Sequence, residues 1–518
     1  MKLTSARLSQ YLFLALFLVL FVATEYRGSD QLWAAVNAFF RADPLVAVSY
    51  LLATRSWSWL IFPGILLLLC SLLLGRFFCG WICPLGTLLD MVTGRIRKRG
   101  AVRFLAGNFR FWLLGGLLAA ALLGVNLVGL FDPLALLVRG LTLFLYPLFG
   151  DAVRQGWVGL YRLLGDGRDL LAPGYALLRD YLLPFRETFY PLALTSVLLL
   201  FGVFALEATE SRAWCRRLCP LGTLLGIAAR FSLVRREPAG LCADCGACRQ
   251  LCPTSFDREL LQQEECILCL DCQLHCAQQR VRFHLVRPAA TDGAWLPERR
   301  ALLGGMVGGV LLVGGLRFRV PEAKARLLRP PGVRDEGEFL RKCVRCGECM
   351  KVCLKNALYP AVFQAGAAGL FTPIVLPRLG YCEYNCTLCG QVCPTAAIPN
   401  LPVAQKRREV IGRAVFDKNH CLPFARKVNC IVCEEHCPIP QKAIRAETVS
   451  EIDAQGKSIL LREPFVVDEL CNGCGICEHV CPLEGKAGIE VFAVQDHTPP
   501  LLPERRSAPA EATVDPYR

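Results

Sequence analysis

Histidine is scarce in this chain. Its 518 residues include six histidines, and none of them precedes His275. The apolar N-terminal segments therefore cannot supply axial histidines for a b-type haem. The Cys-x-x-Cys-His motif that attaches c-type haem is missing as well. We expect no haem in this protein.

Charged residues are also few, at 20% of the chain, whereas hydrophobic residues make up 54%. This balance excludes a disordered chain and argues against an ordinary soluble enzyme. The net charge is +14, but the basic residues gather beside apolar runs and no nucleic-acid-binding motif accompanies them. We therefore expect membrane lipid, and no nucleic acid, as a partner. No glycine-rich nucleotide loop and no Ser/His/Asp signature is recognisable, so the sequence identifies no catalytic residue.

Apolar runs long enough to cross a bilayer as helices dominate the first 206 residues. They are four in number, at about 9–24, 57–75, 111–131 and 189–206. The apolar stretch 133–149 is interrupted by Arg139 and Pro147, which predicts an interfacial or re-entrant segment. A fifth run, 301–316, is short and rich in glycine. The sequence thus predicts an α-helical membrane domain of about five transmembrane helices.

Lysine and arginine are distributed unevenly between the loops. Segments 25–56 and 132–187 are balanced in charge, whereas 76–110 and the residues after 206 carry a large basic excess. The positive-inside rule then predicts a multi-pass protein of the bacterial inner membrane, with 207–298 in the cytoplasm and 321–518 in the periplasm. Arg299-Arg300 precedes the fifth run, so residues 299–320 are either a twin-arginine-like export leader or an ordinary anchor with a basic flank. We favour an uncut tether.

Cysteine is abundant, and 24 of the 29 cysteines fall into six groups of four. Four groups have the spacing Cys-x2-Cys-x2-Cys-x3-Cys: Cys242, Cys245, Cys248, Cys252; Cys266, Cys269, Cys272, Cys276; Cys343, Cys346, Cys349, Cys353; and Cys471, Cys474, Cys477, Cys481. Two groups widen the first gap: Cys382, Cys386, Cys389, Cys393 and Cys421, Cys430, Cys433, Cys437. Three closely spaced thiolates with a fourth beyond them are typical of [4Fe–4S] ligation, whereas zinc favours two Cys-x-x-Cys pairs separated by a longer loop. The sequence predicts six [4Fe–4S] clusters held in α+β domains of the bacterial ferredoxin type.

In such two-cluster modules the fourth cysteine of one group ligates the cluster of its partner group. Cys276 would then complete the first group, and Cys252 the second. The four C-terminal groups allow sequential or nested pairing. Because the two regular groups are outermost, we expect nesting: Cys481 with the group that begins at Cys343, Cys353 with that at Cys471, Cys437 with that at Cys382, and Cys393 with that at Cys421.

Four further cysteines form an internal repeat, Cys-x3-Cys-Pro-Leu-Gly-Thr-Leu-Leu, which follows the second and the fourth apolar runs. They are Cys79, Cys83, Cys215 and Cys219. The repeat indicates two parallel halves of the membrane domain. The four thiolates could hold one additional metal centre, or the cysteines could only pack at two helix entries. Both interpretations remain open.

Other polar residues are candidates for minor roles. His420, His436 and His479 lie among the cluster loops and would tune cluster potentials through hydrogen bonds. Glu25, Asp132 and Glu187 lie at the predicted outer side of the membrane, where they could accept a proton, although ordinary interfacial charges are the simpler interpretation.

These motifs resemble known families. The paired Cys-x3-Cys-Pro motifs, followed by two ferredoxin groups, resemble NapH, the membrane quinol dehydrogenase subunit of periplasmic nitrate reduction; this half also resembles NosR and CcoG. Residues 299–518, an Arg-Arg leader followed by four cysteine groups, are similar to the MauM/NapG ferredoxins. The chain would then be a fusion of a NapH-like membrane domain (1–235), a cytoplasmic two-cluster domain (236–298), a leader or anchor (299–320) and a NapG-like four-cluster domain (321–518).

The resemblance implies electron transfer from the quinone pool through the clusters to a periplasmic redox protein, such as a cytochrome or a molybdenum-containing reductase of the nitrate reductase type. The alternative is an assembly or maturation factor, like CcoG, that reduces a metal or a thiol for a respiratory enzyme.

Overall fold

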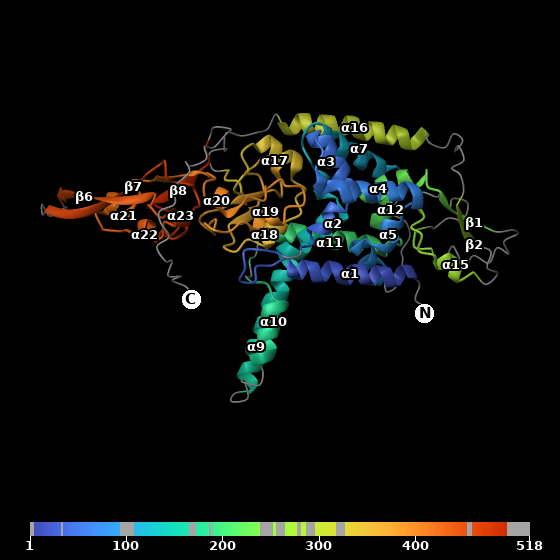
Figure 1. Cartoon of the computed structure of the whole chain (residues 1–518), viewed down its shortest axis with the longest axis horizontal. Coiled ribbons are helices and arrows are strands. Elements are labelled where there is room, and N and C mark those ends of the chain that lie inside the picture. The colour runs from blue at the N-terminus through green and yellow to red at the C-terminus, as the bar shows by residue number, and fades with distance from the viewer. Residues whose placement is uncertain are drawn as a thin grey trace.

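The computed structural model describes residues 5–32, 35–93, 108–164, 172–185, 188, 190–238, 252–254, 265–276, 281–285, 296–317, 327–452 and 458–494. Figure 1 shows an elongated molecule with a helical bundle on one side and the C-terminal residues continuing from one end of that bundle. The N-terminus lies near the opposite end, where β1 (Val234–Pro238) pairs with β2 (Val281–Leu285). We call these the inner end, near the N-terminus, and the outer end, at the C-terminal part.

The bundle is built from the apolar helices of the N-terminal half and one later helix. They are α1 (Ser5–Ala23), α3 (Pro44–Thr54), α4 (Phe62–Leu74), α7 (Phe109–Leu122), α8 (Pro133–Gly140), α11 (Ala193–Ala205), α13 (Pro220–Ala229) and α16 (Leu296–Arg317). Short helices follow α4 and α11 at the inner end: α5 (Phe77–Trp81), α6 (Pro84–Thr93) and α12 (Ala213–Arg217). The two halves of the cysteine repeat therefore enter the same end of the bundle.

Two of the described helices are long and apolar enough to cross a bilayer: Ser5–Ala23 and the continuous run Pro133–Leu163. The runs expected at 57–75, 111–131 and 189–206 give helices of 10–17 residues. Gly75 ends α4 and Gly124 follows α7, each with φ of 82°, a conformation that stops a helix. A domain of five spanning helices is therefore not confirmed.

Arg139 and Pro147 do not break the helix over the stretch 133–149, and the interfacial or re-entrant position expected for this stretch stays a prediction. The helix continues through both residues, from α8 through a π-helical turn (Leu141–Leu145) into α9 (Tyr146–Leu164). The missing N–H of Pro147 costs little, because the proline lies directly after the π turn, where the regular ladder of hydrogen bonds is already shifted. Arg139 is buried, and its Nη atoms donate to carbonyl oxygens, including that of Gly129 at 3.1 Å.

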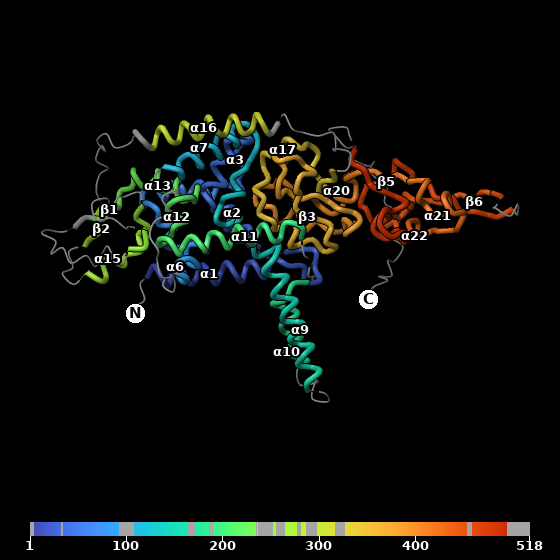
Figure 2. Tube along the Cα trace, turned by 180° about the vertical axis from the view of Figure 1, so that it is seen from behind, coloured from blue at the N-terminus to red at the C-terminus, as the bar shows by residue number. Residues whose placement is uncertain are grey.

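Glycines explain why the run 301–316 is only weakly apolar. A Cβ on Gly309 would lie 2.5 Å from the carbonyl oxygen of Gly116, and one on Gly305 would lie 2.2 Å from that of Trp112. The backbones of α7 and α16 thus approach each other closely through small residues, as in helix pairs within membranes. Helix α16 is an integral part of the bundle, as Figure 2 also shows.

Within 327–452 and 458–494, the C-terminal part contains short helices, cysteine loops and three two-stranded antiparallel sheets. The sheets are β3 (Leu358–Pro360) with β4 (Pro373–Val375), β5 (Arg413–Phe416) with β8 (Ile489–Phe492), and β6 (Ile444–Ile452) with β7 (Ser458–Val466). Figure 1 shows that the β6–β7 hairpin forms the tip farthest from the bundle. This architecture agrees with the expected α+β domains of ferredoxin type.

Polar contacts attach the C-terminal part to the outer end of the bundle. Arg139 donates to the carbonyl oxygen of Arg345 (3.4 Å), and its guanidinium lies 4.3 Å from the ring centroid of Phe371. Lys351 pairs with Glu25 at 3.0 Å and also donates to two backbone oxygens at the end of α1. All these partners are buried or nearly so, and the two parts form a continuous hydrophobic core through Val344 and Cys346.

Candidate iron–sulfur sites

The four repeat cysteines meet at the inner end of the bundle. Cys79, Cys83, Cys215 and Cys219 are 4–8% exposed and belong to one hydrophobic core. The four side chains lie close together. Burial raises the pKa of the thiols of Cys83, Cys215 and Cys219, and a negative charge on a neighbouring thiolate would raise it further. The thiols of Cys83 and Cys219 accept the backbone N–H of Gly86 (3.5 Å) and Gly222 (3.2 Å), so the two halves have matching local geometry.

Two arginines tie the halves together, and sequence reasoning missed them. Arg212 donates to the carbonyl oxygen of Cys79 (2.7 Å), and Arg76 donates to that of Cys215 (3.3 Å). Each arginine precedes the first cysteine of its own half by three residues and reaches the other half. Reading the repeat three residues upstream of each Cys-x3-Cys would have revealed the pair.

The two halves differ in how the arginine is held. Asp90 accepts both the Nε (2.7 Å) and an Nη (2.6 Å) of Arg212, whereas the equivalent position in the second half is Gly226. Arg212 also has a φ of 47° and its backbone N–H donates to Glu207 at 2.9 Å. A bidentate ion pair of this kind fixes the orientation of the fully buried guanidinium.

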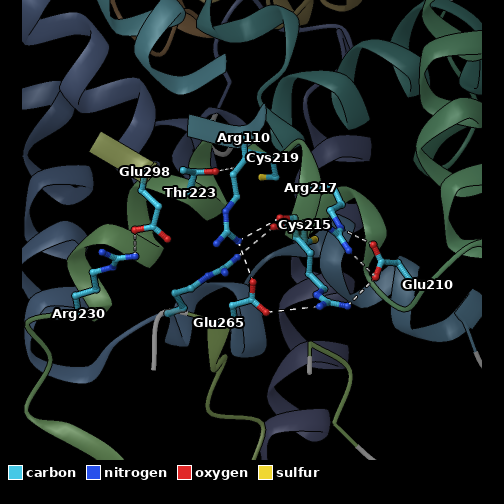
Figure 3. Close-up of polar contacts among 11 residues, drawn as sticks. Arg110, Glu210, Cys215, Arg217, Cys219, Thr223, Arg230, Glu265 and Glu298 are labelled. Atoms are coloured by element: carbon cyan, nitrogen blue, oxygen red, sulfur yellow. Dashed lines mark hydrogen bonds and ion pairs between the residues drawn. The ribbon is translucent and has the colours of Figure 1, made fainter. Parts of the chain in front are cut away.

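A network of ion pairs surrounds this centre, as Figure 3 shows. Glu210 pairs with Arg216 (3.0 Å) and Arg217 (2.6 Å), while Glu265 pairs with Arg110 (3.1 Å) and Arg216 (3.6 Å). Because Glu265 directly precedes Cys266, the network fixes the second ferredoxin group against the repeat cysteines.

The loop of that second group packs directly on the first half of the repeat. Trp81 donates to the carbonyl oxygen of Leu268 (3.0 Å), and a Cβ on Gly80 would lie 2.1 Å from that of Ile267. Cys252 lies near Cys266 and Cys269, in agreement with the expected exchange of the fourth cysteine. Cys242, Cys245 and Cys248 lie outside the described residues, as does Glu187.

In the C-terminal part the expected nested pairing is wrong, because the groups pair sequentially. Cys393 lies beside Cys343, Cys346 and Cys349, and Cys353 lies beside Cys382, Cys386 and Cys389. Cys437 lies beside Cys471 and Cys474, and Cys481 beside Cys421. One small cavity is lined by Cys353 with Cys382, Cys386 and Cys389, and another by Cys481 with Cys421, Cys430 and Cys433. Each set has the three-plus-one composition that a cubane needs.

The sets of Cys343 and Cys382 form one pair, and the sets of Cys471 and Cys421 form a second pair. The two pairs adjoin each other through the sets of Cys382 and Cys471. The backbone N–H of Cys382 donates to the carbonyl oxygen of Cys474 at 2.9 Å. The order outward from the bundle is therefore the set of Cys343, then that of Cys382, then that of Cys471, and last that of Cys421. Figure 1 shows α18 (Glu348–Lys351) and α19 (Leu388–Gln391) beside the bundle, then α23 (Ile476–His479) and last α22 (Val432–Glu435) toward the tip.

The chemistry of these thiols suits iron–sulfur ligation. Burial raises the pKa of Cys386, Cys433 and Cys474 to about 12, so each thiol stays protonated until a cation displaces the proton. Across the described parts of the chain, no three His, Cys, Asp or Glu side chains converge on a point that would hold a single ion.

The remaining candidates occupy structural positions. Asp132 caps α8 by accepting the N–H of Ala135 (2.8 Å) and also hydrogen bonds to Asp43, which caps α3. His420 contacts Asp417 (2.9 Å), and His436 and His479 contact the backbone oxygens of Val432 (2.9 Å) and Arg378 (3.3 Å). The proposed tuning role of these histidines stays a prediction.

Comparison with known proteins adds independent support. The family model described as a 4Fe-4S binding domain matches residues 56–101 and 191–237, which are the two halves of the cysteine repeat. MauM of Methylorubrum extorquens, a methylamine utilization ferredoxin-type protein, is 35% identical over 210 residues, covering 38% of this chain and 89% of that protein. This chain belongs to the MauM/NapG family of ferredoxin-type proteins.

Two further relatives agree with this assignment. The ferredoxin-type protein NapG of Escherichia coli is 35% identical over 186 residues, covering 35% of this chain and 78% of NapG. The ferredoxin-type protein NapF of the same organism is 33% identical over 157 residues, covering 30% of this chain and 80% of NapF. No solved structure matches this MauM/NapG-type chain. The protein is thus an iron–sulfur protein of ferredoxin type, and each of these matches leaves more than half of the chain uncovered.

Proposed function

We propose that this protein is a membrane-embedded electron carrier that takes electrons from quinol and passes them through [4Fe–4S] clusters to a periplasmic acceptor. The observation that carries the proposal is the row of four cysteine sets that runs from the core of the bundle to the β6–β7 tip. Cubane clusters supply one-electron transfer when bound in such sets. A row with one end in an apolar bundle and the other at an exposed tip suits a carrier better than a catalytic pocket.

The surface of the bundle supports an inner-membrane location with several spans. Large apolar side chains are exposed on the outward faces of α1, α4, α11 and α16, among them Leu12, Leu69, Phe201 and Leu311. Trp57 and Trp59, 52% and 77% exposed, precede α4 near the outer end, where an aromatic belt would meet the headgroups. In this arrangement the inner end and the 207–298 segment face the cytoplasm, and residues 321–518 face the periplasm.

Helix α16 is proposed to be a retained tether. Its close glycine contacts with α7 and the ion pair of Glu298 with Arg230 hold it in the bundle, so that it would anchor the residues that follow it. The Arg299-Arg300 pair can still act as an export signal, because the cluster domain must cross the membrane already folded.

The chain's own residues would hold and orient the redox groups. The 24 cysteines of the six groups are proposed to ligate six clusters, and Cys79, Cys83, Cys215 and Cys219 to ligate one more. Arg76 and Arg212 would keep the two halves of the last site in register, and their positive charges would favour the electron-rich thiolate set. The N-terminal half would then correspond to NapH and the C-terminal half to NapG.

Quinol-dependent cluster reduction in the purified protein tests this proposal. A water-soluble quinol should bleach the visible absorbance of the clusters and produce reduced-cluster EPR signals under anaerobic conditions. Dithionite sets the full extent of reduction as the control. A protein that dithionite reduces and no quinol of suitable potential reduces would contradict the proposed function.

The maturation-factor alternative is less well supported by the geometry. A factor that reduces a metal or thiol on a partner needs accessible cysteines, yet the repeat cysteines are at most 8% exposed. Periplasmic acceptors such as a cytochrome or a nitrate reductase-type enzyme fit the exposed tip better. Co-purification of the acceptor under mild crosslinking would distinguish the two functions.

A further inference from the structure

A narrow cleft lies at the outer end of the bundle, where the membrane part meets the cluster domain. Glu25 and Tyr26 follow α1, Tyr146 and Pro147 begin α9, and Phe185 follows α10 (Ala172–Tyr181). The opposite wall belongs to the cluster domain and consists of Lys351, Val352, Cys353, Leu354 and Asn356. The cleft is thus built from both halves of the chain and would not exist in either half alone.

The helices beside the cleft indicate at which level of the membrane it would lie. Both views show α9 and α10 projecting from the side of the molecule, across the direction of α1. The two helices contact each other through Trp157 and Tyr175, with ring centroids 5.8 Å apart. Leu163, Leu177 and Tyr181 are 86%, 63% and 69% exposed, which suits a hairpin lying in the membrane interface. The cleft at its base would therefore open at the level of the outer headgroups.

One predicted cluster ligand belongs to the wall of this cleft. Cys353 lines it directly and completes the set of Cys382. Tyr190, also in the lining, lies close enough to both Cys349 and Cys353 for their charges to influence it. A molecule in the cleft would thus adjoin two cysteine sets that belong to neighbouring clusters.

The polar groups in the cleft suit a hydroxyl-bearing ring. One oxygen of Glu25 pairs with Lys351 (3.0 Å), and the other accepts the N–H of Phe185 (3.2 Å), which leaves lone pairs on a carboxylate that lines the cleft. Tyr26 and Phe185 pack edge to face with centroids 5.1 Å apart in connecting segments. These rings provide aromatic surroundings for a planar headgroup. The free volume of the cleft is about 20 Å³, so a quinol ring enters only if the half-exposed Phe185 turns aside.

We propose that this cleft is the quinol-oxidation site, an inference that rests on the proposed function. The quinol ring lies between the Tyr26–Phe185 side and Cys353, with one hydroxyl hydrogen bonded to Glu25. Both O–H bonds of the quinol break to give the quinone. One proton would pass through the Glu25 carboxylate and the other to water at the membrane surface, and the two electrons would go to the clusters that the sets of Cys343 and Cys382 are proposed to hold.

Binding of a quinol analogue gives a test independent of turnover. The fluorescence of heptyl-hydroxyquinoline N-oxide is titrated with the full-length protein in detergent, and the quenching reports binding. Thr188, which lines the cleft, is changed to Trp to fill it, and Glu25→Gln removes the carboxylate while keeping the shape. Leu460→Trp, at a 70% exposed position on β7, is the matched control.

We expect Thr188→Trp to weaken analogue binding and to slow quinol-dependent cluster reduction, each at least tenfold. Glu25→Gln should slow reduction by a similar factor. Dithionite-reduced EPR signals should be unchanged in all variants, which shows that the clusters are present. Leu460→Trp should behave as the parent protein.

The outcomes separate this inference from the proposed function. Parent-like binding and quinol-dependent reduction in Thr188→Trp would overturn the cleft assignment, while the function as a quinol-dependent carrier would stand. Failure of quinol to reduce the parent protein would instead contradict the proposed function itself. Loss of the EPR signals in Glu25→Gln would mean that Glu25 maintains the interface, and Thr188→Trp then decides the assignment.

Discussion

Single cysteines determine how the outer clusters are shared between groups. Sequential pairing predicts that Cys393→Ser alters the cluster of Cys343, Cys346 and Cys349, which is the one nearest the bundle. Cys481→Ser should instead alter the outermost cluster, that of Cys421. Because the two clusters occupy different surroundings, EPR power saturation and redox titration of each variant should reveal changes in different signals. The reverse result, with Cys481→Ser altering the cluster nearest the bundle and Cys393→Ser altering the outermost one, would favour the nested arrangement.

Arg212 makes the most demanding polar contacts at the inner end. It is fully buried and is shared between the carbonyl oxygen of Cys79 and the carboxylate of Asp90. A lysine cannot donate to both partners at once. Breaking a buried ion pair costs about 3–5 kcal/mol, and the cost is smaller here because Asp90 is partly exposed. Arg212→Lys should therefore lower the free energy of unfolding by about 2 kcal/mol. Thermal unfolding of the purified protein measures this.

The exposed pair Arg179–Asp180 offers the matched control, because both side chains are more than half exposed. Arg179→Lys should leave the melting temperature unchanged. Equal melting temperatures for Arg212→Lys and Arg179→Lys would show that the contact with Cys79 carries little energy.

At the scale of elements, the α7–α16 crossing depends on which face of α16 carries each glycine. Gly309 faces the backbone of Gly116, so Gly309→Leu should force the helices apart and destabilise the bundle by about 1–3 kcal/mol, as overpacking does elsewhere. Gly308 has no neighbour within 4 Å of its position for a Cβ. Gly308→Leu should therefore be tolerated, with both variants compared by accumulation in membranes and by thermal unfolding. Equal stability of the two variants would contradict the close packing of α16.

The iron content of the whole molecule tests the number of clusters. Six sets of four cysteines predict about 24 irons per chain by the ligand rule. A further cluster at the repeat cysteines would raise the content by about four irons, and replacing Cys79 and Cys215 together by serine would remove that increment. Anaerobic iron and sulfide analysis provides the measurement. A stable protein with about eight irons, or with zinc alone, would refute the proposed cluster content.

The division of the whole molecule across the membrane predicts a protease pattern. Protease added to spheroplasts should degrade the residues after about 320 and spare the inner end, as the positive-inside rule requires. Changing Arg299 and Arg300 to lysine should leave the C-terminal part inside, and protected, if the pair is an export signal. Protection of that part in the parent protein would overturn both the topology and the periplasmic acceptor.

The sequence by itself determined which residues form the cysteine groups, because the spacing within a group is a property of one short loop. It also indicated the internal repeat and the apolar character of the N-terminal half. It could not establish the length of each helix in the bundle. Whether a helix stops at Gly75 or continues through Pro147 depends on local backbone conformation and on the packing of neighbouring helices, which hydropathy does not report.

Only the tertiary structure decided how distant segments combine. The sharing of Cys393 and Cys353 between adjacent groups, and the crossed contacts of Arg76 and Arg212, join residues that no local pattern relates. The cleft between Glu25 and Cys353 depends on the docking of the C-terminal part against the end of the bundle. Such contacts arise from the complementary shapes and charges of two folded surfaces, and neither surface exists until its own segment of the chain has folded.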